Sequence, residues 1–150
     1  MRKKLVVIIL LLLIIFGSFW MIYSPNHFKV GNAFFSIPDG FKTIENNDFV
    51  NLTNGNEYIC FIKNNENEDI NKSIKNFVEI KQKDNISVKI TNFTINDVNV
   101  FKSSENKGSQ ISYYWFIKNG MMYKIFTLSG NSNTDDLVRD EIKTMDVSFF

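Results

Sequence analysis

The chain has 150 residues, with 17 Lys and Arg against 16 Asp and Glu and a formal net charge of +1. This balance excludes the basic footprint of a nucleic-acid-binding protein. The chain has one Cys, Cys60, so no internal disulfide can form and the fold must be held by packing. Cys60 lies in the apolar run Tyr58–Ile62, which predicts a buried side chain.

The first element in chain order is an apolar stretch from Leu5 to Tyr23. As a helix it would be about 28 Å long, close to the roughly 30 Å hydrocarbon core of a bilayer. Basic residues at positions 2–4 precede it, and the next basic residue is Lys29. The positive-inside rule therefore predicts a transmembrane signal anchor at 5–23, with residues 1–4 in the cytoplasm and residues 24–150 outside the cell membrane.

A cleaved signal peptide also begins with basic residues and an apolar core, but its cleavage site needs two small residues in alternate positions. No such pair occurs near the end of the apolar stretch, and Gly31 and Ala33 lie about ten residues beyond it. The sequence favours an uncleaved anchor and leaves secretion as the alternative.

A spacer follows at residues 24–27, and residues 28–150 are long enough for one domain with a core. Its lone His, His27, is expected to be a spacer residue. Short extended segments are predicted first, broken by turns at Gly31–Asn32 and Pro38–Gly40. Asn54-Gly55 then predicts a hairpin. These segments are 28–30, 33–37, 41–44, 48–53 and 58–63.

A helix is expected from Asp69 to about 81–84, because Ile70, Ile74, Phe77 and Val78 recur at helical spacing. A strand follows at 86–91, where apolar and polar residues alternate. The alternation changes near Asn92, which predicts a bulge. A short strand at 98–101 and a polar loop at 103–108 complete this part.

Asn119-Gly120 is the strongest local signal, a type I′ turn between strands 111–118 and 121–128. Both faces of these strands are apolar, which predicts a central position covered on both sides. A second helix is expected to begin at Asn133 or Thr134 and to end near Met145. Residues 146–150 are expected to form a last strand.

Hairpin-linked strands with two helices favour an α+β fold, an antiparallel β-sheet flanked by a helix on each face in an α/β/α sandwich. The chain resembles the PsbP-like group in the segments Phe35–Phe41, Tyr114–Ile125 and Ile142–Phe149. That group includes an extrinsic photosystem subunit, the Ran-binding Mog-type factor and small envelope lipoproteins. Small membrane-anchored proteins of methanogenic archaea have a similar Ile-Pro-Asp-Gly segment. The resemblance implies a sheet between helices, a binding or assembly role and no catalytic residues.

The residue pattern does not indicate a group of reactive side chains that could form a catalytic or metal site. Cys60 and His27 lie far apart in sequence, and a zinc site would need more ligands. No glycine-rich phosphate loop is present. Glu66, Glu68 and Asp69 lack the spacing of a calcium loop and are expected to be solvated. We therefore expect no enzyme activity, no cofactor and no metal.

Four aromatic side chains form the one concentration that could bind a partner: Tyr113, Tyr114, Trp115 and Tyr123. A core role is the alternative for them. The function expected is a membrane-anchored extracytoplasmic binding or assembly module whose partner is another envelope protein or a small ligand. A carboxylate-dependent glycan hydrolase and a purely structural spacer are the alternatives. Sequons at Asn51, Asn71, Asn85 and Asn92 leave glycosylation open.

Overall fold

A computed structural model of the chain shows a mostly β protein, with 51% of the described residues in strands and 24% in helices. The described residues are 26–63, 69–105, 111–128 and 132–147. The expected α+β class is therefore wrong. It assumed one sheet with a helix over each face, whereas the strands here form two sheets, and the smaller sheet takes part of the place expected for a helix.

Seven strands make the larger sheet, in the order β3-β4-β5-β9-β8-β7-β6, and three make the smaller sheet, in the order β1-β2-β10. Every neighbouring pair is antiparallel. The strands are β1 His27–Val30, β2 Ala33–Ser36, β3 Lys42–Glu45, β4 Phe49–Thr53, β5 Tyr58–Ile62, β6 Val88–Ile95, β7 Val98–Glu105, β8 Ile111–Lys118, β9 Met121–Leu128 and β10 Asp146–Val147.

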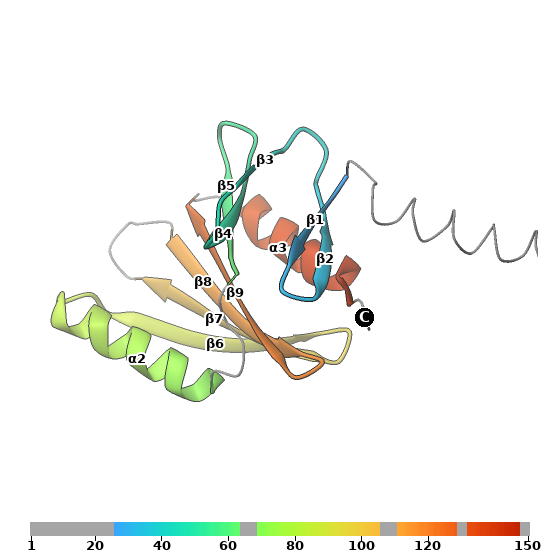
Figure 1. Cartoon of the computed structure of the whole chain (residues 1–150). Helices are drawn as coiled ribbons and strands as arrows, with labels where there is room; N and C mark the ends of the chain where they lie inside the picture. Colours follow the sequence, from blue (N-terminus) through green and yellow to red (C-terminus); the bar gives the residue numbers. More distant parts are fainter. Residues whose placement is uncertain (1–25, 64–68, 106–110, 129–131, 148–150) are drawn as a thin grey trace, which may run out of the picture.

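The two helices are α2, Ile70–Lys83, and α3, Ser132–Thr144, and they lie on opposite faces of the seven-stranded sheet (Figure 1). We call the face that carries α2 the outer face and the face that carries α3 the inner face. As predicted, α2 begins after Asp69, whose carboxylate accepts the backbone N–H groups of Asn71 and Lys72. The Phe77 side chain of α2 packs against Tyr113 and Trp115 of β8.

The hydrophobic core lies on the inner face, between the larger sheet, the smaller sheet and α3. Phe28 of β1 and Phe35 of β2 pack against Phe61 of β5, with ring centroids 4.8 Å apart in each pair. Val138 and Ile142 of α3 are fully buried in the same cluster. Burial of apolar side chains from three layers is the main favourable term that holds these elements together.

Two predicted hairpins are confirmed, and a third turn was missed. Strands β8 and β9 have the predicted bounds and pair around Asn119-Gly120, and β4 pairs with β5 around Asn54-Gly55. The bulge expected near Asn92 is wrong, because all eight residues of β6 pair in register with β7. Asn96 and Asp97, both at positive φ, form the turn between them, and β7 continues to Glu105 where a loop was expected.

Several expectations fall on residues outside the described ranges. The predicted transmembrane helix at 5–23 is one of them, as are the loop residues Glu66 and Glu68 and the end of the last predicted strand. Within the described ranges, neither helix is both long enough and apolar enough to cross a membrane. The spacer expected at 24–27 is shorter than predicted, because β1 already begins at His27.

Candidate functional site

The four aromatic residues proposed as a partner-binding set do not share one surface. Tyr114 and Tyr123 face the buried core on the inner side and are 1% and 2% exposed. Trp115 faces the outer side but is 3% exposed, beneath Phe77 of α2. Of the four, only Tyr113 is more than a few per cent exposed, and it lies half-buried on the outer face. The structure therefore assigns three of the four to packing.

The inner-face tyrosines use their hydroxyl groups to position neighbouring elements. Tyr114 donates to the Asp135 carboxylate at the start of α3, which also forms an ion pair with Lys102 of β7. Burial and the Asp135 carboxylate raise the pKa of Tyr114. Tyr123 donates to the Asn32 side chain at 2.7 Å, and burial raises its pKa to about 12. A phenol held protonated in this way donates a hydrogen bond and is no base at neutral pH.

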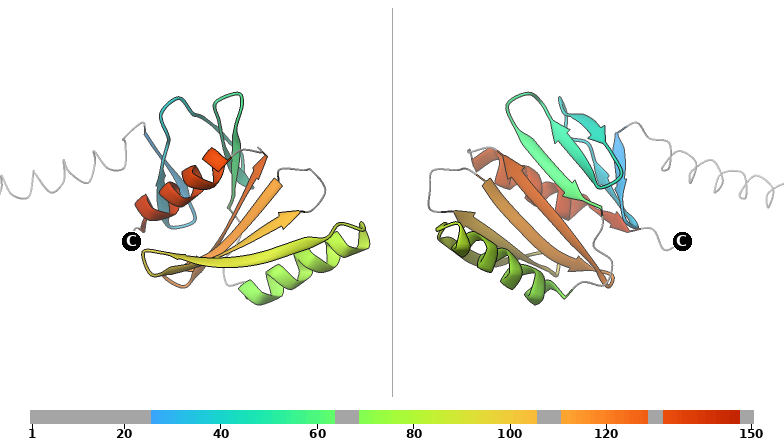
Figure 2. Two further views of the ribbon diagram at one scale, coloured as in Figure 1. Left: turned by 180° about the vertical axis from the view of Figure 1, so that it is seen from behind. Right: turned by 60° about the vertical axis from the view of Figure 1, so that its left-hand side comes forward.

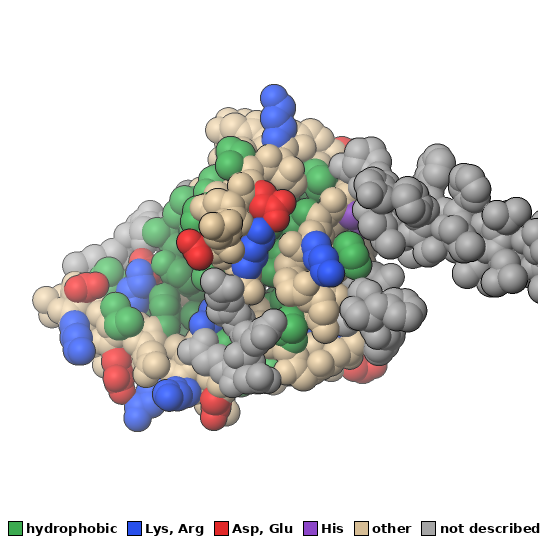
Figure 3. Space-filling model, viewed as in Figure 1, with side chains coloured by type: hydrophobic (Ala, Val, Ile, Leu, Met, Phe, Trp, Pro, Cys, Tyr) green, Lys and Arg blue, Asp and Glu red, His purple; other side chains and the backbone are tan. Residues whose placement is uncertain are grey.

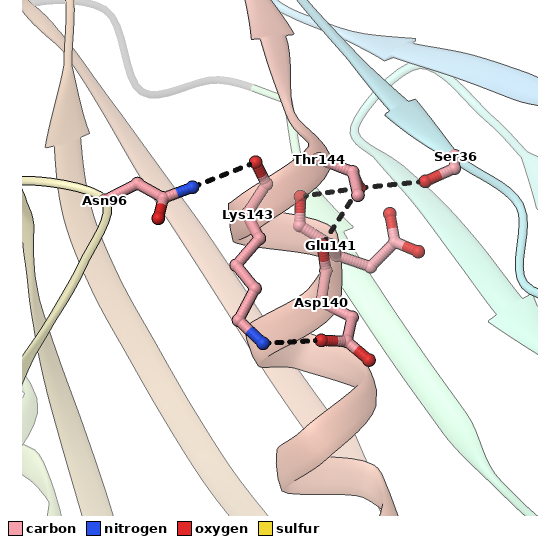
Figure 4. A network of polar contacts seen from close by, with 6 residues as sticks. All are labelled: Ser36, Asn96, Asp140, Glu141, Lys143 and Thr144. Atoms are coloured by element: carbon pink, nitrogen blue, oxygen red, sulfur yellow. Dashed lines mark hydrogen bonds and ion pairs between the residues drawn. The ribbon is translucent and has the colours of Figure 1, made fainter.

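A polar network fixes the other end of α3 (Figure 4). The hydroxyl groups of Ser36 and Thr144 lie 3.0 Å apart and join β2 to the helix. Asn96 donates to the Lys143 carbonyl oxygen at 3.4 Å, which ties the β6–β7 turn to the same helix end. The helix is thus anchored at its start by Tyr114 and at its end by this network.

Glu141 of α3 has a strongly perturbed carboxyl group. It is 3% exposed, and its Oε2 atom has no hydrogen-bond partner among the described residues. Burial, and secondarily the neighbouring Asp140 carboxylate, raise its pKa to about 8. Asp140 itself is exposed and pairs with Lys143, so the two carboxyl groups do not face one opening.

The outer face is the largest feature that could receive a partner. A 14-residue helix is roughly 21 Å long and 10 Å wide, whereas seven strands at about 4.8 Å spacing are more than 28 Å across. Helix α2 lies over β6, β7 and β8, and its contacts include Phe77 on Tyr113 and the Lys81–Glu105 ion pair. One helix cannot cover the rest of the sheet, and Figure 2 shows β5 and β9 without a helix over them on this side.

Apolar side chains occupy the part of this face that neither described helix covers. Ile44 and Leu128 are 57% and 47% exposed, and both lie on it. Apolar atoms gather there between α2 and strands β4 and β5 in Figure 3. We call this region the outer apolar surface. Its members are Ile44, Phe49, Tyr58, Ile62, Phe126 and Leu128.

Two polar groups lie under the outer apolar surface. The register aligns Ile44, Asn51, Cys60 and Phe126 in one row across β3, β4, β5 and β9. Cys60 is buried as predicted, and burial raises its pKa to about 12, so the thiol is unreactive. The Asn51 Oδ1 atom is buried without a hydrogen-bond partner among the described residues. Asn51 is 4% exposed, which excludes glycosylation of the folded domain at this sequon.

A shallow depression of about 390 Å³ lies between β2 and β3, around the turn Pro38–Gly40. Of the described residues that line it, only Asp39 carries a carboxylate and only Lys42 carries a positive charge. Within the described ranges no group of three or more His, Cys, Asp or Glu could hold a metal ion. A depression with one carboxylate lacks the pair that glycoside hydrolysis needs.

Sequence reasoning missed the outer apolar surface because it assumed that both faces of the central strands would be covered. The sequence did contain a signal, because it predicts only two helices, which are too few to cover both faces of a sheet with many strands. No family model matches the chain, and no curated protein matches it. Neither comparison bears on the resemblance to the PsbP-like group, which stays a prediction.

Proposed function

We propose that this protein is a binding or assembly module that recognises another envelope protein through its outer apolar surface. The observation that carries the proposal is that two of the four large apolar side chains exposed among the described residues, Ile44 and Leu128, lie on the outer apolar surface. A third, Ile117, lies on the same sheet face. An exposed apolar patch with aromatic side chains is typical of protein interaction sites. Phe126 is an aromatic member of the surface, and its ring centroid lies 5.8 Å from that of Tyr113.

We further propose that residues 5–23 hold the module at the cell membrane, with the domain outside. Support comes from the apolar stretch and the basic residues before it. The described chain begins at Asn26, next to β1, and the smaller sheet packs on the inner face. In this proposal the first described residue, Asn26, lies on the inner-face side of the larger sheet, opposite the outer apolar surface.

The location is tested by the amino-terminal sequence of the protein isolated from its own cells. We expect protein in the membrane fraction that keeps residues 5–23, because no pair of small residues that would form a cleavage site occurs near the end of this stretch. Protein recovered from the medium and beginning beyond position 24 would show that the apolar stretch is a cleaved signal.

Photo-crosslinking tests the binding surface. A benzoylphenylalanine replaces Ile44, Leu128 or Ile80, one position at a time, in the full chain in its native membrane. Ile80 is the matched control, because it is 58% exposed but lies on α2. We expect Ile44 and Leu128 to crosslink to the same protein and Ile80 to give no such product. Equal products at all three positions, or none at Ile44 and Leu128, would contradict the proposal.

A further inference from the structure

The outer edge of β6 has no partner strand within the part of the chain that the structure describes. The larger sheet ends at β3 on one side and at β6 on the other, and no described strand pairs with the far side of either. An edge strand presents a row of free N–H and C=O groups that another strand can bind. At β6 this row is eight residues long and regular, since β6 pairs with β7 without a bulge.

The turn geometry shows which backbone groups point outward. Asn96 and Asp97 have φ values of 43° and 65°, as in a two-residue type I′ turn. Such a turn makes Ile95 and Val98 a hydrogen-bonded pair, and bonded and non-bonded pairs then alternate along the ladder. The residues of β6 that direct both N–H and C=O away from β7 are therefore Val88, Ile90, Asn92 and Thr94.

Among the described residues, this edge is longer and more regular than a protected edge usually is. Natural edge strands are often short, charged, bulged, interrupted by proline or covered by another element. Helix α2 contacts β6, but it lies on the outer face of the sheet. At the other end of the sheet, β3 has four residues, with Lys42 and Glu45 at its ends. By contrast, β6 has the sequence VKITNFTI, in which Lys89 is the one charged residue. The side chains of Thr91, Asn92 and Thr94 are exposed along it.

We propose that β6 pairs antiparallel with β6 of a second copy of this chain across a two-fold axis, joining two sheets into one. The complement of such an edge is a strand of similar length with little charge and a free edge, and among the described strands β6 itself meets these conditions. A two-fold axis brings identical strands together antiparallel. Anchoring both copies in one membrane would raise their effective concentration.

One register uses all four outward-pointing residues. It places Val88 opposite Thr94 of the second copy and Ile90 opposite its Asn92, so that each N–H and C=O finds a partner. Thr91 then lies opposite Thr91 of the second copy in a non-hydrogen-bonded pair, where Cα atoms are about 4.5 Å apart. Lys89 lies opposite Phe93, so no like charges are directly opposed within the strand pair.

Disulfide trapping tests this register, because a Cα separation of about 4.5 Å allows a disulfide. Thr91→Cys is compared with Thr43→Cys, an exposed threonine on the edge strand β3. The native Cys60 is buried and does not compete. In the full chain in its membrane under mild oxidation, we expect a disulfide-linked dimer from Thr91→Cys and little from Thr43→Cys. Equal yields from both variants would overturn the proposal.

A second comparison distinguishes the contribution of backbone hydrogen bonds to the dimer from that of side chains. Asn92→Pro removes an outward N–H but no β6–β7 hydrogen bond, whereas Asn92→Ala keeps the N–H. We expect Asn92→Pro to raise the dissociation constant of the detergent-solubilised dimer about tenfold or more. Asn92→Ala and Ile44→Asp should leave it unchanged, since neither removes an edge group. A chain that is monomeric at every concentration, or a dimer indifferent to Asn92→Pro, would overturn the proposal.

Discussion

At the scale of single residues, Glu141 is the clearest case of a group whose environment conflicts with its chemistry. Its carboxyl group lies at 3% exposure, and Figure 4 shows it turned away from the exposed Lys143 side of α3, with no contact drawn to it. A buried charge without a partner is costly, so the folded protein favours the protonated form. The hydroxyl groups of Ser36 and Thr144 bond to each other, and that of Thr144 also donates to the backbone carbonyl oxygens of Asp140 and Glu141, so neither is bonded to this carboxyl group.

We predict that this residue makes the protein less stable as the pH rises. Its pKa is about 8 in the folded state against 4.5 as the reference, so the unfolded chain loses its proton first. The contribution of Glu141 is therefore most favourable below pH 4.5 and decreases until about pH 8. Glu141→Gln should remove this slope and raise the free energy of unfolding at pH 8 by about 1–3 kcal/mol.

Urea denaturation between pH 5 and pH 9 measures this effect. Asp140→Asn is the matched control, because Asp140 is exposed and adjacent in sequence. It should preserve most of the slope. The prediction fails if the pH dependence of Glu141→Gln equals that of the unmodified protein.

At the scale of secondary structure, tight turns with positive φ set the register of the hairpins. Gly31, between β1 and β2, has φ +60°, and Gly120, between β8 and β9, has φ +77°. The two differ in their surroundings. A Cβ atom at Gly31 would lie 2.5 Å from the Met121 Sδ atom, whereas nothing lies within 4 Å at Gly120. Gly31 therefore also allows the small sheet to approach β9 closely.

We predict that Gly120→Ala destabilises the protein by about 1 kcal/mol through backbone strain alone. Gly31→Ala should cost up to about 1 kcal/mol more, because the flexible Met121 side chain must also move. Thermal or urea unfolding of the two variants measures the difference. Combining Gly31→Ala with Met121→Ala should remove most of the excess, and equal costs for the two single variants would show that the contact is unimportant.

Local signals in the sequence were sufficient to predict the helices and strands that short-range interactions determine. Asp69 followed by apolar residues at helical spacing predicted α2, and Asn119-Gly120 predicted β8 and β9 with their observed bounds. The Asn96-Asp97 turn was missed because Asn-Gly, the usual signal, is absent there. The change of pattern near Asn92 was interpreted as a bulge. It arises because Phe93 and Ile95 face the core while Val88 and Ile90 face the α2 side.

At the scale of the whole molecule, the expected fold class was wrong because layer composition depends on contacts distant in sequence. Nothing local to Phe28 or Phe35 indicates that their hairpin leaves the main sheet and packs over Phe61. The candidate surface was missed for a similar reason. Tyr114 and Tyr123 belong to an aromatic cluster in the sequence, yet their strands direct them into the core. Ile44 and Leu128 are far apart in the sequence, and only the seven-stranded sheet brings them onto one surface.

The central claim, that the outer apolar surface binds another envelope protein, is tested most directly by charge substitution. The full chain carrying Ile44→Asp and Leu128→Asp is compared with the Ile80→Asp control for the amount of partner recovered after crosslinking in native membranes. Because all three side chains are exposed, each substitution should change stability by about 0.5 kcal/mol or less. We predict at least a tenfold loss of the partner with the double variant and no loss with the control. Equal recovery from both would contradict the account.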